Sequence, residues 1–272
     1  SAIAKLALLN NLDSSRNMDL YLKLNHDFDP KLLALPLHNL HPLLYLIHVD
    51  FDRLIPFFEK AIEIEQGHKV MSHILLFAHL NGYPESERLL NIILDKSEIA
   101  IKTVVHIAFE NINDEKSFNK CNEIILRFLD NNSDEIAEQY SHSFYHLKPE
   151  LFYKIEEYLF KYIESKAGIK RESSFYKYLE ESLQFYQDKA IAEKCIDLAL
   201  KFNNHEKPNI TESALSNEPL KVVVDAYSII RDYDMKTQHL ELAMDAFDSM
   251  LKVPEYRGNM KDMLNKLDES IL

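Results

Sequence analysis

The residues with the clearest potential for chemistry are histidines that stand close together. His142 and His146 are one helical turn apart, and His38 and His41 form a similar pair beside Pro42. Two imidazoles on one helix face can share a zinc ion, but a zinc site needs three or four protein ligands. No further Cys or His follows at a suitable spacing, so we interpret both pairs as surface or interface residues and expect no metal site.

The common catalytic and cofactor-binding motifs are missing from the sequence. There is no GxxxxGK[ST] phosphate-binding loop, and the four glycines are too scattered to build one. HExxH, CxxC and GxSxG patterns are missing as well. The carboxylate pairs Glu156-Glu157 and Glu180-Glu181 would need a cleft and shifted pKa values for acid–base catalysis. We interpret them as helix-surface charges and predict no catalytic residue, no cofactor and no enzyme.

The two cysteines and the distribution of apolar residues indicate a compartment. Cys121 and Cys195 each lie inside an apolar helical pattern, which is typical of small core residues in a reducing cytoplasm. No apolar run approaches the ~18 residues of a membrane span, and no signal peptide opens the chain. We therefore expect a cytoplasmic protein with no membrane partner. Because the first residue is Ser1 and not Met, we also expect a piece of a longer protein.

The charge balance narrows the class of partner. The chain carries 31 basic and 44 acidic residues, a net charge of −13. Nucleic-acid binding depends largely on neutralising phosphates, which disfavours an acidic chain. The richest basic segment holds only Lys166, Lys170 and Arg171, and we interpret it as a solvated turn. The balance favours solubility or a basic protein partner, so we expect a protein partner and no nucleic acid.

The chain that carries these residues reads as helical almost throughout. Apolar residues recur at three and four in 54–62 and 70–78, and only 4 Gly and 9 Pro supply turns. Pro149 is predicted to start a helix that reaches about Lys166, with Gly168 as its terminator. Pairing neighbouring helices predicts antiparallel hairpins near residues 84–111, 115–147, 149–186, 188–231 and 236–270.

An internal repeat predicts how these hairpins are arranged. The apolar helix that ends in Leu94-Asp95 is echoed 35 residues later by one that ends in Leu129-Asp130, and Glu98-Ile99-Ala100 is echoed by Glu135-Ile136-Ala137. A period of this size is typical of stacked helical hairpins. We predict an all-α fold, a right-handed α-solenoid of the HEAT, ARM or TPR type. Residues 1–50 are predicted to form an irregular helical N-terminal cap and residues 51–272 the solenoid.

Aromatic residues suggest where the solenoid binds. Residues 140–186 hold 13 of the 29 Phe and Tyr residues. At 100° per residue, most of these rings fall on the predicted buried faces of two helices. Four lie outside those faces and are candidates for a partner-binding patch, since interfaces favour such side chains. The alternative is that neighbouring hairpins cover each helix on two sides. The four candidates are Tyr153, Phe160, Tyr178 and Phe185.

Two parts of the chain resemble a known class of proteins. The run from Ile124 to Phe144 is similar to the HEAT-type repeats in the C-terminal part of large bacterial P-loop NTPases. Residues 222–230, 243–251, 256–264 and 267–268 resemble their terminal helices, so the similarity covers roughly 85–270. Glu138-Gln139 stands where a HEAT-type second helix often has Arg, which leaves HEAT and TPR-like repeats both open.

The resemblance implies a function for the solenoid. It implies an attachment to an upstream nucleotide-driven module of the STAND type, whose C-terminal helical repeats sense a foreign protein in antiphage defence. We therefore predict that the chain is the ligand-sensing part of a bacterial antiviral-defence NTPase. A general scaffold or adaptor with no immune role is the alternative, and a helical-repeat enzyme acting on nucleic acid is a third.

Overall fold

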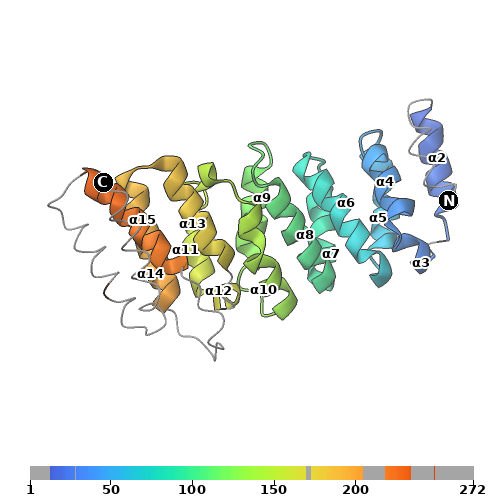
Figure 1. The fold of residues 1–272 in the computed structure, drawn as a ribbon. Helices are drawn as coiled ribbons and strands as arrows, with labels where there is room; N and C mark the ends of the chain where they lie inside the picture. The colour runs from blue at the N-terminus through green and yellow to red at the C-terminus, as the bar shows by residue number, and fades with distance from the viewer. Residues whose placement is uncertain (1–12, 28, 170–172, 205–217, 234–247, 249–272) are drawn as a thin grey trace. The chain divides into compact units, whose positions relative to one another are not determined.

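The chain is helical wherever its structure is described. The computed structural model describes residues 13–27, 29–169, 173–204, 218–233 and 248. All regular secondary structure in these residues is α-helix or short 3-10 helix, with no strand (Figure 1). This confirms the all-α prediction. The predicted hairpin at 236–270 lies almost entirely outside the described residues.

The chain divides into two compact units, Ser1–Phe128 (unit 1) and Leu129–Leu272 (unit 2). The predicted cap at residues 1–50 falls within unit 1 and stays a prediction. The described helices of unit 1 are α2 (Ser14–Leu24), α3 (Pro30–Leu33), α4 (Pro36–Leu46), α5 (Phe51–Ala61), the 3-10 turn η1 (Glu65–Gly67), α6 (His68–Leu80), α7 (Ser86–Lys96), α8 (Glu98–Asn111) and α9 (Phe118–Phe128).

Unit 1 is built around α6 and has a mainly aliphatic core. Helix α6 packs against α4, α7 and α8, and α8 packs in turn against α9. The apolar spacing that predicted these helices also buries them, because residues three and four apart share a face. Ile74, Leu75, Ile93 and Val104 are fully buried on such faces. Helix α6 therefore contacts both the next helix, α7, and the one after it, α8.

Exposed ion pairs join helices of unit 1 that are about one repeat apart. Glu59 on α5 pairs with Arg88 on α7 at 2.8 Å, and Asp19 on α2 pairs with Arg53 on α5 at 2.5 Å. Glu63, just beyond α5, pairs with Lys96 at the end of α7 at 2.5 Å. In each of these pairs the acid comes earlier in the chain and the base comes later.

The internal repeat corresponds to two helix caps. The Ser97 hydroxyl accepts a hydrogen bond from the Ala100 N–H at the start of α8, and the Ser133 hydroxyl accepts one from the Ile136 N–H. The Ser–NH spacing is three residues in both caps, as expected for an N-cap. Counted from the serine, Ala100 and Ile136 are equivalent, and both are buried. Ile99 comes one position earlier and is exposed, so the Glu-Ile-Ala match is one residue out of structural register.

Unit 2 alternates long helices with short irregular turns. Its final described helix, α15, packs against both α14 and α13, and α14 packs against α11. Its described elements are α10 (Asp134–Ser141), the 3-10 turns η2 (Ser143–His146) and η3 (Pro149–Leu151), α11 (Glu156–Glu164), α12 (Lys166–Ile169), α13 (Ser173–Tyr186), α14 (Lys189–Asn204) and α15 (Glu218–Tyr233).

The single helix predicted from Pro149 to about Lys166 is wrong. Pro149 opens only the turn η3, and α11 begins at Glu156 after an irregular stretch in which the Lys154 and Ile155 N–H groups both donate to the Leu151 carbonyl. Proline favours the first position of a helix but does not determine how far the helix continues. The break leaves Tyr153 on a turn rather than inside a helix.

The prediction that Gly168 ends α11 is wrong. Gly168 lies inside the next short helix, α12. Ser165, with an extended backbone, ends α11, and its hydroxyl donates to the Tyr162 carbonyl and accepts from the Gly168 N–H. Gly168 is buried, and a Cβ atom there would collide with the Tyr162 carbonyl oxygen and come within 2.8 Å of that of Ile163. Glycine is required here because the backbones of α11 and α12 approach so closely.

Candidate functional site

The core of unit 2 is a cluster of aromatic rings centred on Phe144. Its ring centroid lies 4.7 Å from that of Tyr162, 5.1 Å from Phe175, 5.7 Å from Tyr158 and 5.9 Å from Tyr178. All five side chains are buried. Edge-on and offset ring pairs at these distances add to the stability gained from burial. The cluster therefore fixes η2, α11 and α13 together within the unit.

Hydrogen bonds satisfy the phenols inside this cluster. The Tyr158 hydroxyl lies 2.9 Å from the Ser143 hydroxyl, and the Tyr178 hydroxyl donates to the Lys148 carbonyl at 3.4 Å. Burial raises the pKa of Tyr158 and of Tyr178 well above the usual value for tyrosine, because the phenolate would lose its hydration. These hydroxyl groups stay protonated at neutral pH and have a structural role.

The prediction that Tyr178 is a surface residue is wrong. Its ring is 1 % exposed and lies between Phe144 and Phe152. Helix geometry placed Tyr178 off the main buried stripe of α13, but the segment that contains Phe152 covers this second side of the helix. Here the alternative of helices covered on two sides is the right one, so Tyr178 is not available to a partner.

Tyr153 and Phe185 are both at the surface and meet through a third ring. Tyr153 is 46 % exposed and Phe185 is 53 % exposed. The ring of Tyr186 lies 5.4 Å from that of Tyr153 and 4.9 Å from that of Phe185. We call Tyr153, Phe185 and Tyr186 the exposed aromatic cluster. The structure thus brings together two of the four predicted residues, which come from different elements.

Tyr186 was not among the predicted residues, although it joins the other two. Its spacing from Leu183 places it on the buried stripe of α13, but the helix ends directly after it, at Gln187, whose φ of 51° is left-handed. A left-handed residue commonly ends a helix, although it is most often glycine. The Tyr186 hydroxyl donates to the Glu150 carbonyl at 3.0 Å, which holds the ring at the rim. The signal available in the sequence was the Phe185-Tyr186 pair at a helix end.

Phe160, the fourth predicted residue, lies on α11 and is covered by a lysine. The ammonium group of Lys201 on α14 stands 4.7 Å from the centre of its ring, and Lys194, two turns earlier, stands 5.1 Å from that of Tyr153. Lys194 also pairs with Glu156 at 2.5 Å. Helix α14 therefore places two lysines over aromatic faces that α11 and the turn before it present.

Carboxylates surround the exposed aromatic cluster. The pKa of Tyr186 is raised, first by partial burial and then by the neighbouring Tyr153, Glu150 and Asp188. Partial burial also raises the pKa of Tyr153, followed by Asp188, whereas Lys194 lowers it. Nearby carboxylates therefore add negative charge around both phenols, and Lys194 offsets part of it at Tyr153.

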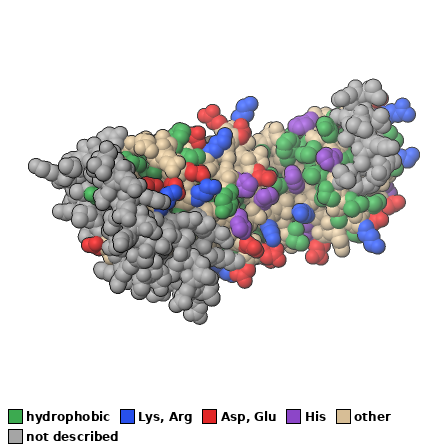
Figure 2. Space-filling model, viewed as in Figure 1, with side chains coloured by type: hydrophobic (Ala, Val, Ile, Leu, Met, Phe, Trp, Pro, Cys, Tyr) green, Lys and Arg blue, Asp and Glu red, His purple; other side chains and the backbone are tan. Residues whose placement is uncertain are grey.

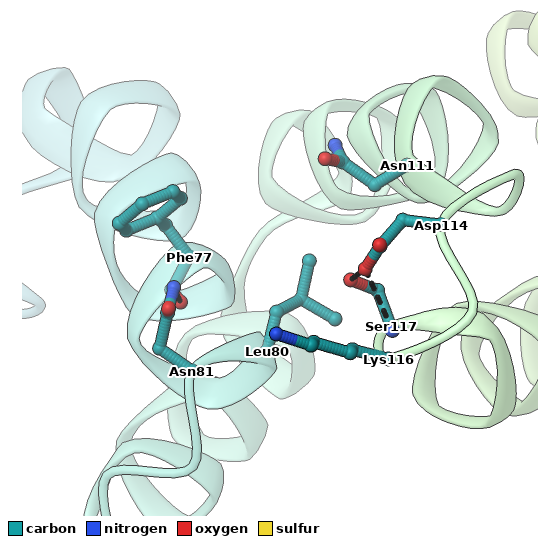
Figure 3. A pocket seen from close by; sticks show the side chains of 7 residues that line it. All are labelled: Phe77, Leu80, Asn81, Asn111, Asp114, Lys116 and Ser117. Atoms are coloured by element: carbon teal, nitrogen blue, oxygen red, sulfur yellow. Dashed lines mark hydrogen bonds between the residues drawn. The ribbon is translucent and has the colours of Figure 1, made fainter.

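Unit 1 contains a surface pocket that the sequence did not indicate. Its volume is about 320 Å³, and it lies between the ends of α6 and α8 and the loop that follows α8 (Figure 3). Asp114 accepts hydrogen bonds from the Ser117 N–H and hydroxyl groups, which lower its pKa. Its carboxylate is ionised and already engaged, so the pocket suits a small polar ligand better than acid–base catalysis. Phe77, Leu80, Asn81, Asn111, Asp114, Lys116 and Ser117 line it.

The residues that first suggested metal or thiol chemistry are dispersed. His142 follows α10 and His146 ends η2, so the predicted pair does not lie on one continuous α-helix. No group of three or more His, Cys, Asp or Glu side chains in the described part of the chain is arranged to hold a metal ion. Cys121 and Cys195 are free and buried, and burial raises the pKa of the Cys121 thiol to about 12. Neither thiol is poised as a nucleophile.

Comparison of the chain with protein-family models, curated proteins and solved structures finds no match. No function is therefore transferred from a relative. Within the described residues, no helix combines the length and apolar character needed to cross a membrane. On the face drawn in Figure 2, acidic and basic side chains are interspersed over the described residues, with several histidines at the surface of unit 1.

Proposed function

We propose that this chain is a protein-binding helical-repeat domain, the ligand-sensing C-terminal part of a bacterial antiviral-defence NTPase. The observation that carries the binding role is the exposed aromatic cluster. Its rings contact buried neighbours such as Phe152, which lies 6.0 Å from Tyr153, so the surface rings are held in place before binding. Aromatic side chains fixed in this way bind with little loss of conformational entropy.

The proposal includes a right-handed α-solenoid of stacked hairpins, which provides a broad surface for a folded partner. Within unit 1, the packing of α6 on both α7 and α8 supports this arrangement, as do the ion pairs at one-repeat spacing. Within unit 2, Asp134 pairs with Lys166 at 3.1 Å and Glu156 with Lys194 at 2.5 Å, again with the acid first.

The sensor role rests on the resemblance to the C-terminal repeats of STAND-type NTPases. A sensor of this kind acts by binding its ligand more tightly in the active state, which shifts the activation equilibrium of an attached NTPase. The sequence contains no catalytic motif of its own, so the proposal assigns nucleotide hydrolysis to an upstream module. It places the domain in the bacterial cytoplasm, where two unpaired and buried thiols are stable.

Capture of a phage protein tests the proposal. The immobilised chain is incubated with lysates of infected and uninfected bacteria, and bound proteins are quantified by mass spectrometry. We expect wild type to retain a protein found only after infection and Tyr153→Ser/Phe185→Ser to lose it. The control is Tyr145→Ser, which removes a ring that is 59 % exposed but lies outside the exposed aromatic cluster.

The outcomes separate the parts of the proposal. Capture of the same host protein from both lysates would favour a general scaffold over a defence sensor. Equal loss of capture in the Tyr145→Ser variant would show that the cluster has no particular role. Each substituted ring is at the surface, so we expect all variants to keep the helical fold. Circular dichroism checks this expectation.

A further inference from the structure

Several aromatic rings of unit 2 that are not fully buried already have a lysine over one face. Lys177 stands 5.7 Å from the ring centre of Tyr145, Lys194 covers Tyr153, and Lys201 covers Phe160. A cation over a ring is attracted by the negative charge density of its face. This surface therefore uses cation–aromatic pairs repeatedly, with cations that the chain itself supplies.

Phe185 is exposed and lacks such a lysine among the described residues. Its ring contacts Tyr186 edge-on, at an interplanar angle of 85°, and it remains 53 % exposed. An edge-on contact occupies part of the ring and leaves a face accessible to a ligand. Phe185 can accept a cation that the described part of the chain does not provide.

Acidic residues lie close to the exposed aromatic cluster that holds this ring. Glu181 is one helical turn before Phe185 on α13, so the two side chains are neighbours on the helix surface. Asp188 follows just after the end of α13, and its carboxylate caps α14 by accepting a hydrogen bond from the Ile191 N–H at 3.0 Å. Glu150 is exposed, and its carbonyl oxygen holds the Tyr186 hydroxyl.

Three nearby lysines already have acidic partners. Lys177 pairs with Glu181 at 3.8 Å, a loose contact at the surface, and Lys189 pairs with Glu193 at 3.9 Å. Lys194 is held by Glu156 over Tyr153. The carboxylates of Glu150 and Asp188 both raise the pKa of Tyr186, so they add negative charge near the ring that contacts Phe185.

We propose that the exposed aromatic cluster binds a basic segment of the protein partner, with an arginine or lysine side chain over Phe185 and beside the carboxylates of Glu150, Glu181 and Asp188. This inference rests on the proposed protein-binding function and adds the chemical class of the partner. The ring supplies the face that an arginine stacks on, and the carboxylates supply the charge. Guanidinium groups suit such a site because they stack and pair at the same time.

The test uses NMR of the full chain labelled with ¹³C in its phenylalanine rings. The probes are short Gly/Ser peptides that carry arginine, citrulline, leucine or glutamate at the same positions. Citrulline keeps the shape of arginine and removes its charge. We expect the arginine peptide to shift the Phe185 ring signal in a saturable way, and raised salt to weaken that binding.

Variants locate the interaction. Phe185→Leu keeps an apolar side chain and removes the ring, and we expect it to weaken arginine-peptide binding about two- to fivefold. Because this variant lacks the Phe185 ring, its binding is followed on a sample labelled with ¹³C in the tyrosine rings. Glu181→Gln/Asp188→Asn is expected to weaken binding similarly and to reduce its salt dependence, and asparagine at 188 still caps α14. Tyr145→Leu, whose ring already lies under Lys177, is the control and leaves binding unchanged.

The outcomes distinguish this inference from the proposed function. Equal binding of the arginine and citrulline peptides would overturn the role of charge. Tighter binding of the leucine peptide would overturn the basic partner and leave an apolar protein-binding surface. Failure of every peptide to shift Phe185 also overturns the inference, while the capture experiment with Tyr153→Ser/Phe185→Ser decides the proposed function separately.

Discussion

The interactions that stabilise unit 1 internally differ from those that stabilise unit 2, although both units consist of helices. In unit 1 the core is largely aliphatic, and exposed ion pairs such as Glu59–Arg88 join helices about one repeat apart. In unit 2 the core is a network of aromatic rings around Phe144. Aromatic rings are large and rigid, so a core made of them also fixes rings at its edge. This difference explains why the candidate binding surface lies in unit 2.

The largest expected effect is the loss of the central ring of unit 2. Phe144→Leu keeps most of the buried volume but removes the ring contacts to Tyr158, Tyr162 and Phe175. We expect it to lower the free energy of unfolding by about 2–4 kcal/mol. In unit 1, Phe58 contacts the rings of Phe51 and Phe57, and Phe58→Leu should cost about 1–2 kcal/mol.

Urea unfolding measures both values, and hydrogen exchange with mass spectrometry shows which helices lose protection. The comparison holds if peptides from α11 and α13 respond to Phe144→Leu more strongly than peptides from α5 respond to Phe58→Leu. A greater cost for Phe58→Leu would mean that the ring network is not what distinguishes unit 2.

Two glycines are expected to differ because one lacks space and the other needs an unusual backbone angle. Gly168→Ala places a Cβ atom against the Tyr162 and Ile163 carbonyls, and we expect a loss of about 2–3 kcal/mol. Gly82 has open space around it but a φ of 83°, so Gly82→Ala should cost about 1 kcal/mol. Gly82→Asn is the control, since asparagine tolerates this conformation. Thermal unfolding compares the three, and an equal loss for both alanine variants would contradict the close approach of α11 and α12.

The smallest effect is a difference in pH dependence. Burial lowers the pKa of His73 and His79 in unit 1, so the unfolded chain binds their protons first as the pH falls below about 6.5. Unit 1 is therefore most stable where both histidines are neutral, at pH 7 and above. This stability is lost as the pH falls below about 6.5. In unit 2, burial raises the pKa of Tyr140 and Tyr158, so stability is lost as the pH rises above about 10.

Hydrogen exchange as a function of pH measures both limbs. Around His73 lie its partner groups Glu110, which raises its pKa, and His106, which lowers it. We expect peptides from α6 to lose protection on the acid side in wild type and to lose less in His73→Gln/His79→Gln. Peptides from α11 should respond on the alkaline side. If α6 lost the same protection at low pH in the double variant, the loss would be due to carboxylates and not to these histidines.

Sequence patterns predicted burial better than they predicted continuity. The three- and four-residue spacing of Leu151, Ile155, Tyr158 and Tyr162 predicts one shared helix face, and all four are buried. The helix itself is interrupted between η3 and α11, because burial follows from apolar character at a given spacing, while continuity depends on the backbone hydrogen bonds around each turn. The exposed positions of Tyr153 and Phe185 followed from the same spacing.

What the sequence by itself determined is the helical class and which aromatic residues lie off the main buried stripes. These depend on interactions within a few residues of the chain. Tertiary structure alone decided that Tyr178 is covered by Phe152, that Gly168 sits against two carbonyls, and that Tyr186 joins Tyr153 to Phe185. Each of these depends on segments brought together by packing, which helical periodicity does not encode.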